Sequence, residues 1–259
     1  MTETRTALVR RPSSRLAEGI VTHIERRPVD AELAQAQWAR YVGSLAAAGW
    51  EIAEVAPAEA CADAVFVEDT LVLYGHTAVV TRPGAESRRP EVEGAQHAVA
   101  ALGYQVERIV APGTVEGGDV LRVGDTVYVG TGGRTNAAGA EQLRRALRPL
   151  GATVVEVPLS GVLHLKSMVT TLPDGSIVGH PPLVPEPERF PRFVAVPEES
   201  GAHVVQLGGN GVLVASDCPR SAELFTRLGF EPVPVDIGEF QKREGCVTCL
   251  SVLGARISP

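Results

Sequence analysis

Residues 66–91 read FVEDTLVLYGHTAVVTRPGAESRRPE and contain the unit on which the rest of the chain is patterned. Within this stretch, LVLYGHTAVV has the composition of two short strands joined at Gly75. Two adjacent carboxylates, Glu68 and Asp69, stand at its start, and Arg88 stands among the arginines of the turn-rich end. A hairpin with acid at one end and guanidinium at the other could hold a zwitterion. A solvated hairpin with charged turns would show the same pattern.

The order of strands and helices in this segment recurs four more times along the chain. Each unit is predicted to contain two strands, a helix and a third strand. The first two strands of the units are, in turn, VFVED and TAVVTRP, EGGDVLRV and TVYVGT, HLKSMVTTL and SIVGHP, AHVVQLG and GVLVASD, and TCLSVLGARI and TRTALVRR. The third helix is expected to be short or broken because its segment is rich in proline. Asn210-Gly211 is expected to form the turn of the fourth hairpin.

The fifth ββαβ unit takes its first strand from the C-terminal end of the chain and the remainder from the N-terminal end. Five such units predict a closed ring, because each unit can then bury its face against its neighbours. We expect one α/β domain over residues 1–259 with no linker. The loops that begin the units would converge on the axis of the ring, so a site there would be built from several units.

Composition limits the kinds of partner that the chain can have. It has 44% hydrophobic and 21% charged residues, which is typical of a globular protein. The net charge of −7 disfavours nucleic acid and anionic membranes as partners. No apolar run reaches membrane-spanning length, and the first residues lack the apolar core of a signal peptide. Four cysteines are too few for a disulfide scaffold, so we expect a cytoplasmic protein with reduced thiols.

Four clusters of reactive or charged residues fall near the first strands of four units. They are Asp63 to Asp69, Glu116 to Asp119, His164 to Ser167, and Cys246 to Cys249. In a ring, equivalent places face one another across the axis, so the repeat brings carboxylates, a histidine and a cysteine together. These are a nucleophile, a proton shuttle and cation-binding acids, which are the components of thiol chemistry.

Taken singly, each of these residues also has a structural explanation. Cys249 could be an inert buried thiol, and the Cys246-x-x-Cys249 pair could be a redox pair or half of a zinc site. His164 could be a hydrogen-bonded core histidine. The two glycines after Glu116 could only form a turn, and Arg134 could be an exposed base before a helix that Asn136 caps. Their joint placement is what favours a catalytic site.

With these motifs in hand, the chain resembles the dimethylarginine dimethylaminohydrolases of the guanidine-modifying, or pentein, superfamily. The resemblance covers nearly the whole chain and rests on FVEDT at 66–70, RPGAESRRPE at 82–91, EGGDVL at 116–121, RTN at 134–136, LHLKS at 163–167 and TCLS at 248–251. It implies a five-bladed α/β propeller, in agreement with the number of repeats counted above.

The resemblance also implies roles for individual residues. Cys249 matches the nucleophile, His164 the general acid and base, and Glu116 the acid beside the histidine. Asp69 matches a second carboxylate that holds the substrate guanidinium. The remaining substrate-binding positions surround these groups: Asp63, Arg88 and Arg134 at the amino-acid end, Phe66 and Glu68 lining the pocket, Leu16 in a flexible lid, and Arg243 where the family uses a backbone carbonyl.

Two positions depart from the pattern of the family. Cys246 stands where we expect glycine or a small apolar residue, and Arg243 replaces an apolar side chain. Neither is the nucleophile, the base or the acid, so the predicted reaction stands, while the substrate preference and any effect of Cys246 on Cys249 are left open.

The resemblance predicts hydrolysis of Nω-methylated L-arginine to L-citrulline and methylamine or dimethylamine through a covalent intermediate on Cys249. No metal or cofactor is required, the partner is a small molecule, and a homodimer is compatible with the family. An arginine deiminase-like hydrolase is the nearest alternative, although such enzymes are generally longer. A non-catalytic binding protein on the same propeller and a CxxC redox or zinc protein are more distant alternatives.

Overall fold

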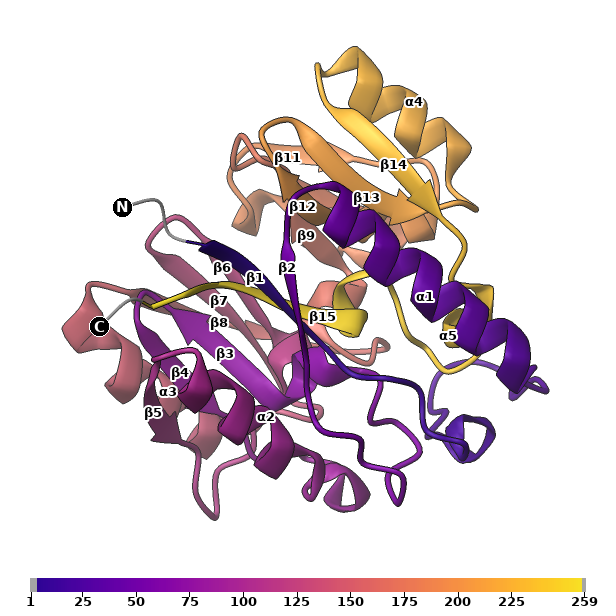
Figure 1. Ribbon diagram of the computed structural model, residues 1–259. Helices are drawn as coiled ribbons and strands as arrows, with labels where there is room; N and C mark the ends of the chain where they lie inside the picture. The colour runs from indigo at the N-terminus through magenta and orange to yellow at the C-terminus, as the bar shows by residue number, and fades with distance from the viewer. Residues whose placement is uncertain (1–3, 258–259) are drawn as a thin grey trace.

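The computed structural model describes residues 4–257, which form five three-stranded sheets (Figure 1). In every sheet the middle strand pairs antiparallel with the first strand of its unit and parallel with the third. This pairing is the expected outcome of a hairpin followed by a crossover connection. The five ββαβ units of the sequence are therefore confirmed as five sheets of a propeller-like α/β fold.

Four units are continuous in the chain, and their strands lie close to the predicted positions. Their strands are β3 (Leu71–Tyr74), β4 (Thr77–Val80) and β5 (Gln105–Arg108); β6 (Val120–Val123), β7 (Thr126–Thr131) and β8 (Thr153–Pro158); β9 (Val169–Thr171), β10 (Ile177–Gly179) and β11 (Phe193–Ala195); and β12 (Val205–Gly208), β13 (Gly211–Ala215) and β14 (Glu231–Val235).

The two ends of the chain meet in the fifth sheet, as predicted. Strand β15 (Ser251–Arg256) pairs antiparallel with β1 (Thr4–Val9), and β1 pairs parallel with β2 (Glu51–Glu54). The register sets Thr4 opposite Arg256, so the described ends lie side by side in Figure 1.

The helices pack against strands of their own units, and the first helix also packs against β14 of the fourth unit. They are α1 (Ala31–Ala47), α2 (Glu91–Ala101), α3 (Ala137–Leu147) and α4 (Pro219–Arg227), and a short α5 (Gly238–Gln241) precedes the segment of Cys249. Asp30 caps α1 by accepting from Leu33 N–H, and Asn136 caps α3 by accepting from Gly139 N–H. The proline-rich third unit has 3₁₀ turns in place of a helix, as expected, whereas α5 was not predicted.

The hydrophobic core consists of five clusters, and each joins two consecutive units. One combines Leu8 and Val252 of the fifth unit with Val80 of the first, and another combines Leu213 of the fourth unit with Tyr41 of the fifth. The other three join the first unit to the second, the second to the third, and the third to the fourth. Burying apolar surface between units is the main stabilisation available to such a repeat.

Two local predictions were wrong in detail. The run VFVED is not extended, because Val67–Thr70 forms a 3₁₀ turn and the strand begins at Leu71. The fourth hairpin turns at Gly209-Asn210, between the paired Gly208 and Gly211, so the turn begins one residue before the predicted Asn210-Gly211. Gly208 and Gly209 have the positive φ that glycine adopts readily. Among residues 4–257, no helix is both long enough and apolar enough to cross a bilayer.

A 3₁₀ turn precedes the first strand of every unit. The five turns are Val67–Thr70, Gly117–Asp119, Leu165–Ser167, Glu199–Ala202 and Thr248–Leu250. The first strands themselves line a common cavity of about 520 Å³, which takes residues from β3, β6, β12 and β15 and Thr170 and Thr171 of β9. First strands of all five units therefore line one cavity, which is called the axial cavity below, and the five turns that precede these strands lie near it.

Candidate active site

The predicted catalytic residues all lie in or beside these 3₁₀ turns. Asp69 and Cys249 lie within their turns, while Glu116 and His164 are the residues just before theirs. The equivalence inferred from the sequence repeat therefore corresponds to an equivalent position in the fold. Since the turns converge, the four side chains face one cavity.

This cavity has a volume of about 30 Å³, far below the roughly 300–1,000 Å³ of a typical small-molecule pocket. Nine of the eleven predicted site residues line it, together with a few neighbours. The nine are Asp63, Phe66, Asp69, Arg88, Glu116, Arg134, His164, Arg243 and Cys249. Glu68 and Leu16 are the two predicted residues that do not line it.

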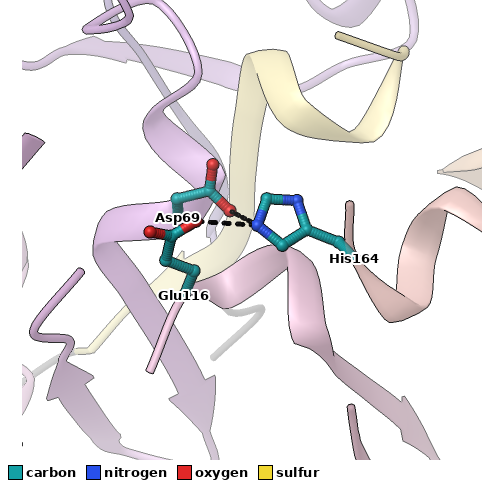
Figure 2. Close-up of side chains that lie close together, drawn as sticks. All are labelled: Asp69, Glu116 and His164. Carbon is teal, nitrogen blue, oxygen red and sulfur yellow. Dashed lines mark hydrogen bonds and ion pairs between the residues drawn. The ribbon is translucent and has the colours of Figure 1, made fainter. Parts of the chain in front are cut away.

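His164 lies between two carboxylates (Figure 2). Its Nε2 is 2.7 Å from Oε2 of Glu116 and 3.8 Å from Oδ1 of Asp69. Burial by itself would lower the pKa of His164, but the charge of Asp69 and the hydrogen bond to Glu116 outweigh it and raise the pKa to about 10. The ring is therefore an imidazolium at neutral pH and can act as a proton donor.

The two carboxylates remain ionised although both are buried. Burial would raise the pKa of Asp69, but His164 and Arg88 lower it to about 2. In Glu116 the hydrogen bond with His164 likewise outweighs burial and lowers the pKa. Backbone N–H groups add to this, because Gly118 donates to Asp69 at 2.9 Å and Ala85 donates to Glu116 at 3.1 Å.

Gly117 and Gly118 are required by this packing. A Cβ on Gly117 would lie 2.0 Å from the carbonyl oxygen of Glu68, and a Cβ on Gly118 would lie 2.7 Å from Nδ1 of His164. The two glycines therefore allow neighbouring units to pack closely, in addition to forming a turn. Any larger residue here would force Asp69 and His164 apart.

Arg88 is buried and already has carboxylate partners. Its Nη1 donates to Oδ2 of Asp69 at 2.5 Å, its Nη2 donates to Glu91 at 2.9 Å, and Nη2 also donates to the carbonyl of Phe66. Glu91 is buried as well and stands three residues after Arg88 on the first turn of α2. Its i, i+3 spacing was visible in the sequence, but nothing in the spacing showed that the pair would be buried.

The segment that contains Leu16 closes over the cavity through backbone hydrogen bonds. Arg243 donates from Nε to the carbonyl of Leu16 at 3.2 Å and from Nη2 to that of Ala17 at 2.9 Å. Asp63 accepts from Ile20 N–H at 3.1 Å. The Leu16 side chain itself packs into the hydrophobic core, so only its main chain faces this region.

Arg134 has more freedom than the other charged groups of the cavity. Its Nη1 is 4.0 Å from Oε1 of Glu116, its Nη2 donates to Oγ1 of Thr22 at 3.3 Å, and a fifth of its side chain is exposed. The neighbouring Asn136 does cap α3, so the helix-cap interpretation of that residue was correct.

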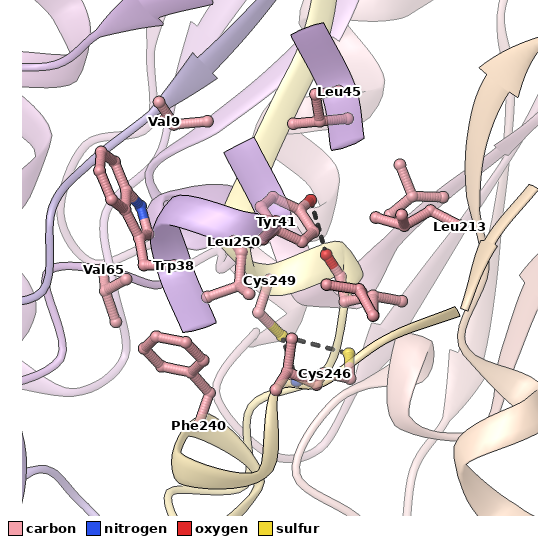
Figure 3. Close-up of a cluster of buried hydrophobic side chains, with 14 of the residues drawn as sticks. Val9, Trp38, Tyr41, Leu45, Val65, Leu213, Phe240, Cys246, Cys249 and Leu250 are labelled. Carbon is pink, nitrogen blue, oxygen red and sulfur yellow. Dashed lines mark hydrogen bonds between the residues drawn. The ribbon is translucent and has the colours of Figure 1, made fainter. Parts of the chain in front are cut away.

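Cys249 lies in a turn that α1 holds in place (Figure 3). The hydroxyl of Tyr41 donates to the carbonyl of Val247 at 2.8 Å and lies 2.7 Å from Oγ of Ser251. The Sγ of Cys249 is 3.3 Å from Sγ of Cys246. That contact, burial and the nearby carboxylates raise the pKa of Cys249, so its thiol is protonated at neutral pH in this arrangement.

Glu68 points away from the cavity that it was expected to line. It forms an ion pair with Lys166 at 2.7 Å and accepts from Oγ1 of Thr248 at 3.0 Å, and all three line the larger axial cavity. Adjacent residues of a 3₁₀ turn are about a third of a turn apart, so Glu68 and Asp69 cannot face the same cavity.

With the geometry established, comparisons with known proteins place the chain among its relatives. The arginine deiminase family model matches residues 64–207. The N(G),N(G)-dimethylarginine dimethylaminohydrolase of Streptomyces coelicolor is 63% identical over 246 residues, which cover 95% of both chains. The chain belongs to the dimethylarginine dimethylaminohydrolase family.

Solved structures of the dimethylarginine dimethylaminohydrolase family share the whole fold. A variant as an adduct with S-methyl-L-thiocitrulline superimposes with a TM-score of 0.91 at 34% identity, covering 98% of this chain and 100% of the other. A mutant of the Pseudomonas aeruginosa enzyme in complex with citrulline superimposes with a TM-score of 0.90 at 34% identity, with the same coverage.

Asp119 is a buried residue beside this candidate site, and the sequence assigned it no role. It accepts from Leu165 N–H at 3.0 Å and from Thr135 Oγ1 at 2.7 Å, while Thr135 Oγ1 also accepts from Glu116 N–H at 3.2 Å. Asp119 thereby ties the backbone beside His164 to the backbone of Glu116. Burial raises its pKa to about 6.

Asp69, Glu116 and His164 also have donor atoms within 4.8 Å of one another, which is close enough to share a metal ion. A metal would have to displace the proton from Nε2, which the two carboxylates hold firmly, and would meet the guanidinium of Arg88 beside Asp69. The charges of these residues therefore favour a proton and an organic cation over a metal ion.

Proposed function

We propose that the chain hydrolyses Nω-methylated L-arginine to L-citrulline and methylamine or dimethylamine. The observation that carries this proposal is the meeting of Cys249, His164, Glu116 and Asp69 around one cavity. The names of the relatives support dimethylarginine as the substrate, and citrulline bound to one of them supports the product. A thiol nucleophile, a proton donor and a pair of anions match what a guanidinium requires.

The two carboxylates receive the guanidinium group. It is a planar cation with N–H donors along its edges, so Glu116 and Asp69 can hold its plane and direct its central carbon towards the Cys249 sulfur. Both carboxylates are ionised and each already contacts a cation. Glu116 contacts the imidazolium of His164, and Asp69 contacts the guanidinium of Arg88. The guanidinium of the substrate therefore binds to anions that already stabilise neighbouring positive charges.

The segment around Leu16 has to open before a substrate enters, because a cavity of about 30 Å³ is too small for an amino acid. The hydrogen bonds that hold it are those from Arg243 to Leu16 and Ala17 and that from Ile20 to Asp63. Opening this segment exposes Asp63, whose carboxylate then becomes available to the α-ammonium group of the substrate.

Bond formation begins at Cys249. Binding of the cation lowers the pKa of the Cys249 thiol, which gives its proton to solvent, and the thiolate then attacks the guanidinium carbon to give a tetrahedral adduct. His164 donates its proton to the departing methylated nitrogen, because an amide anion cannot leave at neutral pH. The product of this half-reaction is an S-alkylthiouronium on Cys249 with a neutral His164 ring.

Hydrolysis completes the cycle. Neutral His164 takes a proton from water as the oxygen attacks the thiouronium carbon, and the second adduct collapses to the urea group of citrulline. The bond to sulfur breaks and the hydroxyl proton of the adduct passes to the Cys249 sulfur, which regenerates the resting thiol beside the imidazolium. Asp119 and Glu116 keep the ring oriented through both proton transfers.

The arginines serve the amino-acid end of the substrate. Arg134 is the freer of the two, so its guanidinium can turn to the α-carboxylate at little cost. Arg88 contributes to the same end and also holds Asp69 and Glu91. Removing Arg88 would therefore disturb both the binding of the carboxylate and the position of a catalytic anion.

The test is citrulline release from asymmetric dimethylarginine, with L-arginine assayed in parallel. Cys249→Ser should lower the rate at least about a thousandfold. Cys218→Ser is the matched control, because Cys218 is a buried thiol at the start of α4 that does not line the cavity. Faster turnover of L-arginine than of dimethylarginine would contradict the proposed substrate, and full activity of the serine variant would contradict the nucleophile.

A further inference from the structure

Cys246 is a buried thiol that the proposed reaction does not use. Its Sγ is 3.3 Å from that of Cys249, and its own N–H points to the Cys249 sulfur at 3.5 Å. The intervening residues make a single helical turn, with Cys249 N–H donating to the carbonyl of Cys246 at 3.2 Å. Figure 3 shows the two sulfurs facing each other. A disulfide bond is about 2.05 Å long, so the sulfurs need to move together by only about 1.2 Å.

The two thiols open onto different cavities. Cys249 lines the small active-site cavity, whereas Cys246 lines a second cavity of about 680 Å³. His23, Arg27 and Asp217 line the second cavity and are exposed, so this cavity reaches the surface. A small solute can therefore approach Cys246 without passing the segment that closes the active site.

The surroundings of Cys246 favour its thiolate, which is the form that reacts with peroxides. The hydrogen bond from Cys249 lowers the pKa of Cys246, and His203 and the hydroxyl of Thr248, 3.2 Å from the sulfur, act in the same direction. Cys249 faces the carboxylates instead, and its pKa is raised. Cys246 is thus the thiol of the pair that lies on the outer cavity and has neighbours that favour its thiolate.

We propose that Cys246 and Cys249 form a reversible disulfide that switches the proposed hydrolase off under hydroperoxide and protects its nucleophile. The Cys246 thiolate attacks a peroxide oxygen and becomes a sulfenic acid, and one water leaves. The Cys249 sulfur then attacks the Cys246 sulfur, forming the S–S bond and expelling a second water. Two thiols and one hydrogen peroxide thereby give one disulfide and two waters.

This step has two consequences, both of which rest on the proposed function. Cys249 in a disulfide cannot attack a guanidinium, so the oxidised protein is inactive. The disulfide also keeps Cys249 from irreversible oxidation to the sulfinic acid, since a small-molecule dithiol can reduce it back to the two thiols. Cys246 therefore provides recovery that a glycine or small apolar residue at its position could not.

The experiment follows mass and activity together after adding hydrogen peroxide to the reduced protein. Trypsin releases residues 244–256, which contain Cys246 and Cys249 and neither of the other two cysteines. In the wild type this peptide should lose two hydrogens as activity falls, and dithiothreitol should restore both the mass and at least about nine-tenths of the activity. In Cys246→Ala, activity should be lost without recovery, as Cys249 gains oxygen.

Cys246→Ser is a second variant of nearly the same volume, and Cys218→Ser is a control that should behave as the wild type. Wild-type protein that loses activity while its 244–256 peptide keeps both hydrogens would overturn the proposal, as would equal recovery in Cys246→Ala. Formation of the disulfide in a protein that releases no citrulline would instead leave the disulfide standing and contradict the hydrolase activity.

Discussion

The small active-site cavity and the large axial cavity share the same turns but differ in chemistry. Four of the 3₁₀ turns, each with the residue before it, contribute to both cavities. The residues that line the active-site cavity are Asp69, Glu116, His164 and Cys249. Their neighbours that line the axial cavity are Glu68, Gly117, Lys166 and Thr248. One side collects the nucleophile, the ring and two anions, while on the other Glu68 and Lys166 neutralise each other. The direction of one side chain in such a turn therefore decides which of the two cavities its charge lies in.

Asp69→Asn should have the largest effect, because it removes the anion on the active-site side. We expect kcat/KM for dimethylarginine to fall by at least about a hundredfold, since a charge-assisted contact contributes about 1.5–3 kcal/mol and Asp69 holds both Arg88 and the His164 ring. Steady-state kinetics measures this. The matched control is Glu68→Gln, its neighbour in sequence, and equal losses in the two variants would remove the distinction between the cavities.

The next effect is on the pH dependence of stability. The folded pKa of His164, about 10, lies above its ordinary 6.5, so the folded state holds this proton more tightly than the unfolded chain. The stabilisation is complete below about pH 6.5 and is lost as pH rises towards 10. Urea unfolding across this window should show a steeper decline in the wild type than in His164→Asn.

His97→Gln is the control for this measurement, because His97 lies exposed on α2. The free energy of unfolding of the His97→Gln variant should change with pH as that of the wild type does. Identical slopes in the wild type and in His164→Asn would contradict the assignment of His164 as an imidazolium held between Asp69 and Glu116.

On the axial side, Glu68→Gln should affect stability more than catalysis. It leaves the Lys166 ammonium without its anion in a largely buried setting, so we expect the free energy of unfolding to fall by about 1–3 kcal/mol while kcat stays within about tenfold. Adding Lys166→Met should restore much of the stability, because both charges are then absent. A double variant less stable than Glu68→Gln would refute the pairing.

The smallest effect is expected from Arg134→Gln on the rim of the active-site cavity. Its partly exposed guanidinium is proposed to bind the α-carboxylate, so KM should rise about tenfold with kcat nearly unchanged. Arg122→Gln is the matched control, since Arg122 lines the axial cavity. A loss of kcat without a change in KM would indicate that Arg134 acts in the chemical step and does not bind the α-carboxylate.

The order of most strands and helices and the identity of the reactive residues could be predicted from the amino-acid sequence alone. Alternating apolar runs such as LVLYGHTAVV specify local strands, and the recurrence of one unit five times implies equivalent positions for Glu116, His164 and Cys249. Strand and helix propensities and the spacing of apolar residues depend on a few neighbouring residues, so a single sequence is enough to show them. The catalytic roles of these residues were predicted from the resemblance of their motifs to a known family.

Only the tertiary structure decided which way neighbouring side chains face. Glu68 and Asp69 are adjacent and chemically alike, and their separation into two cavities follows from a 3₁₀ turn packed between two units. The burial of the ion pair between Arg88 and Glu91 arises in the same way. Burial, charge pairing and close approach depend on residues from other units, and no local pattern contains that information.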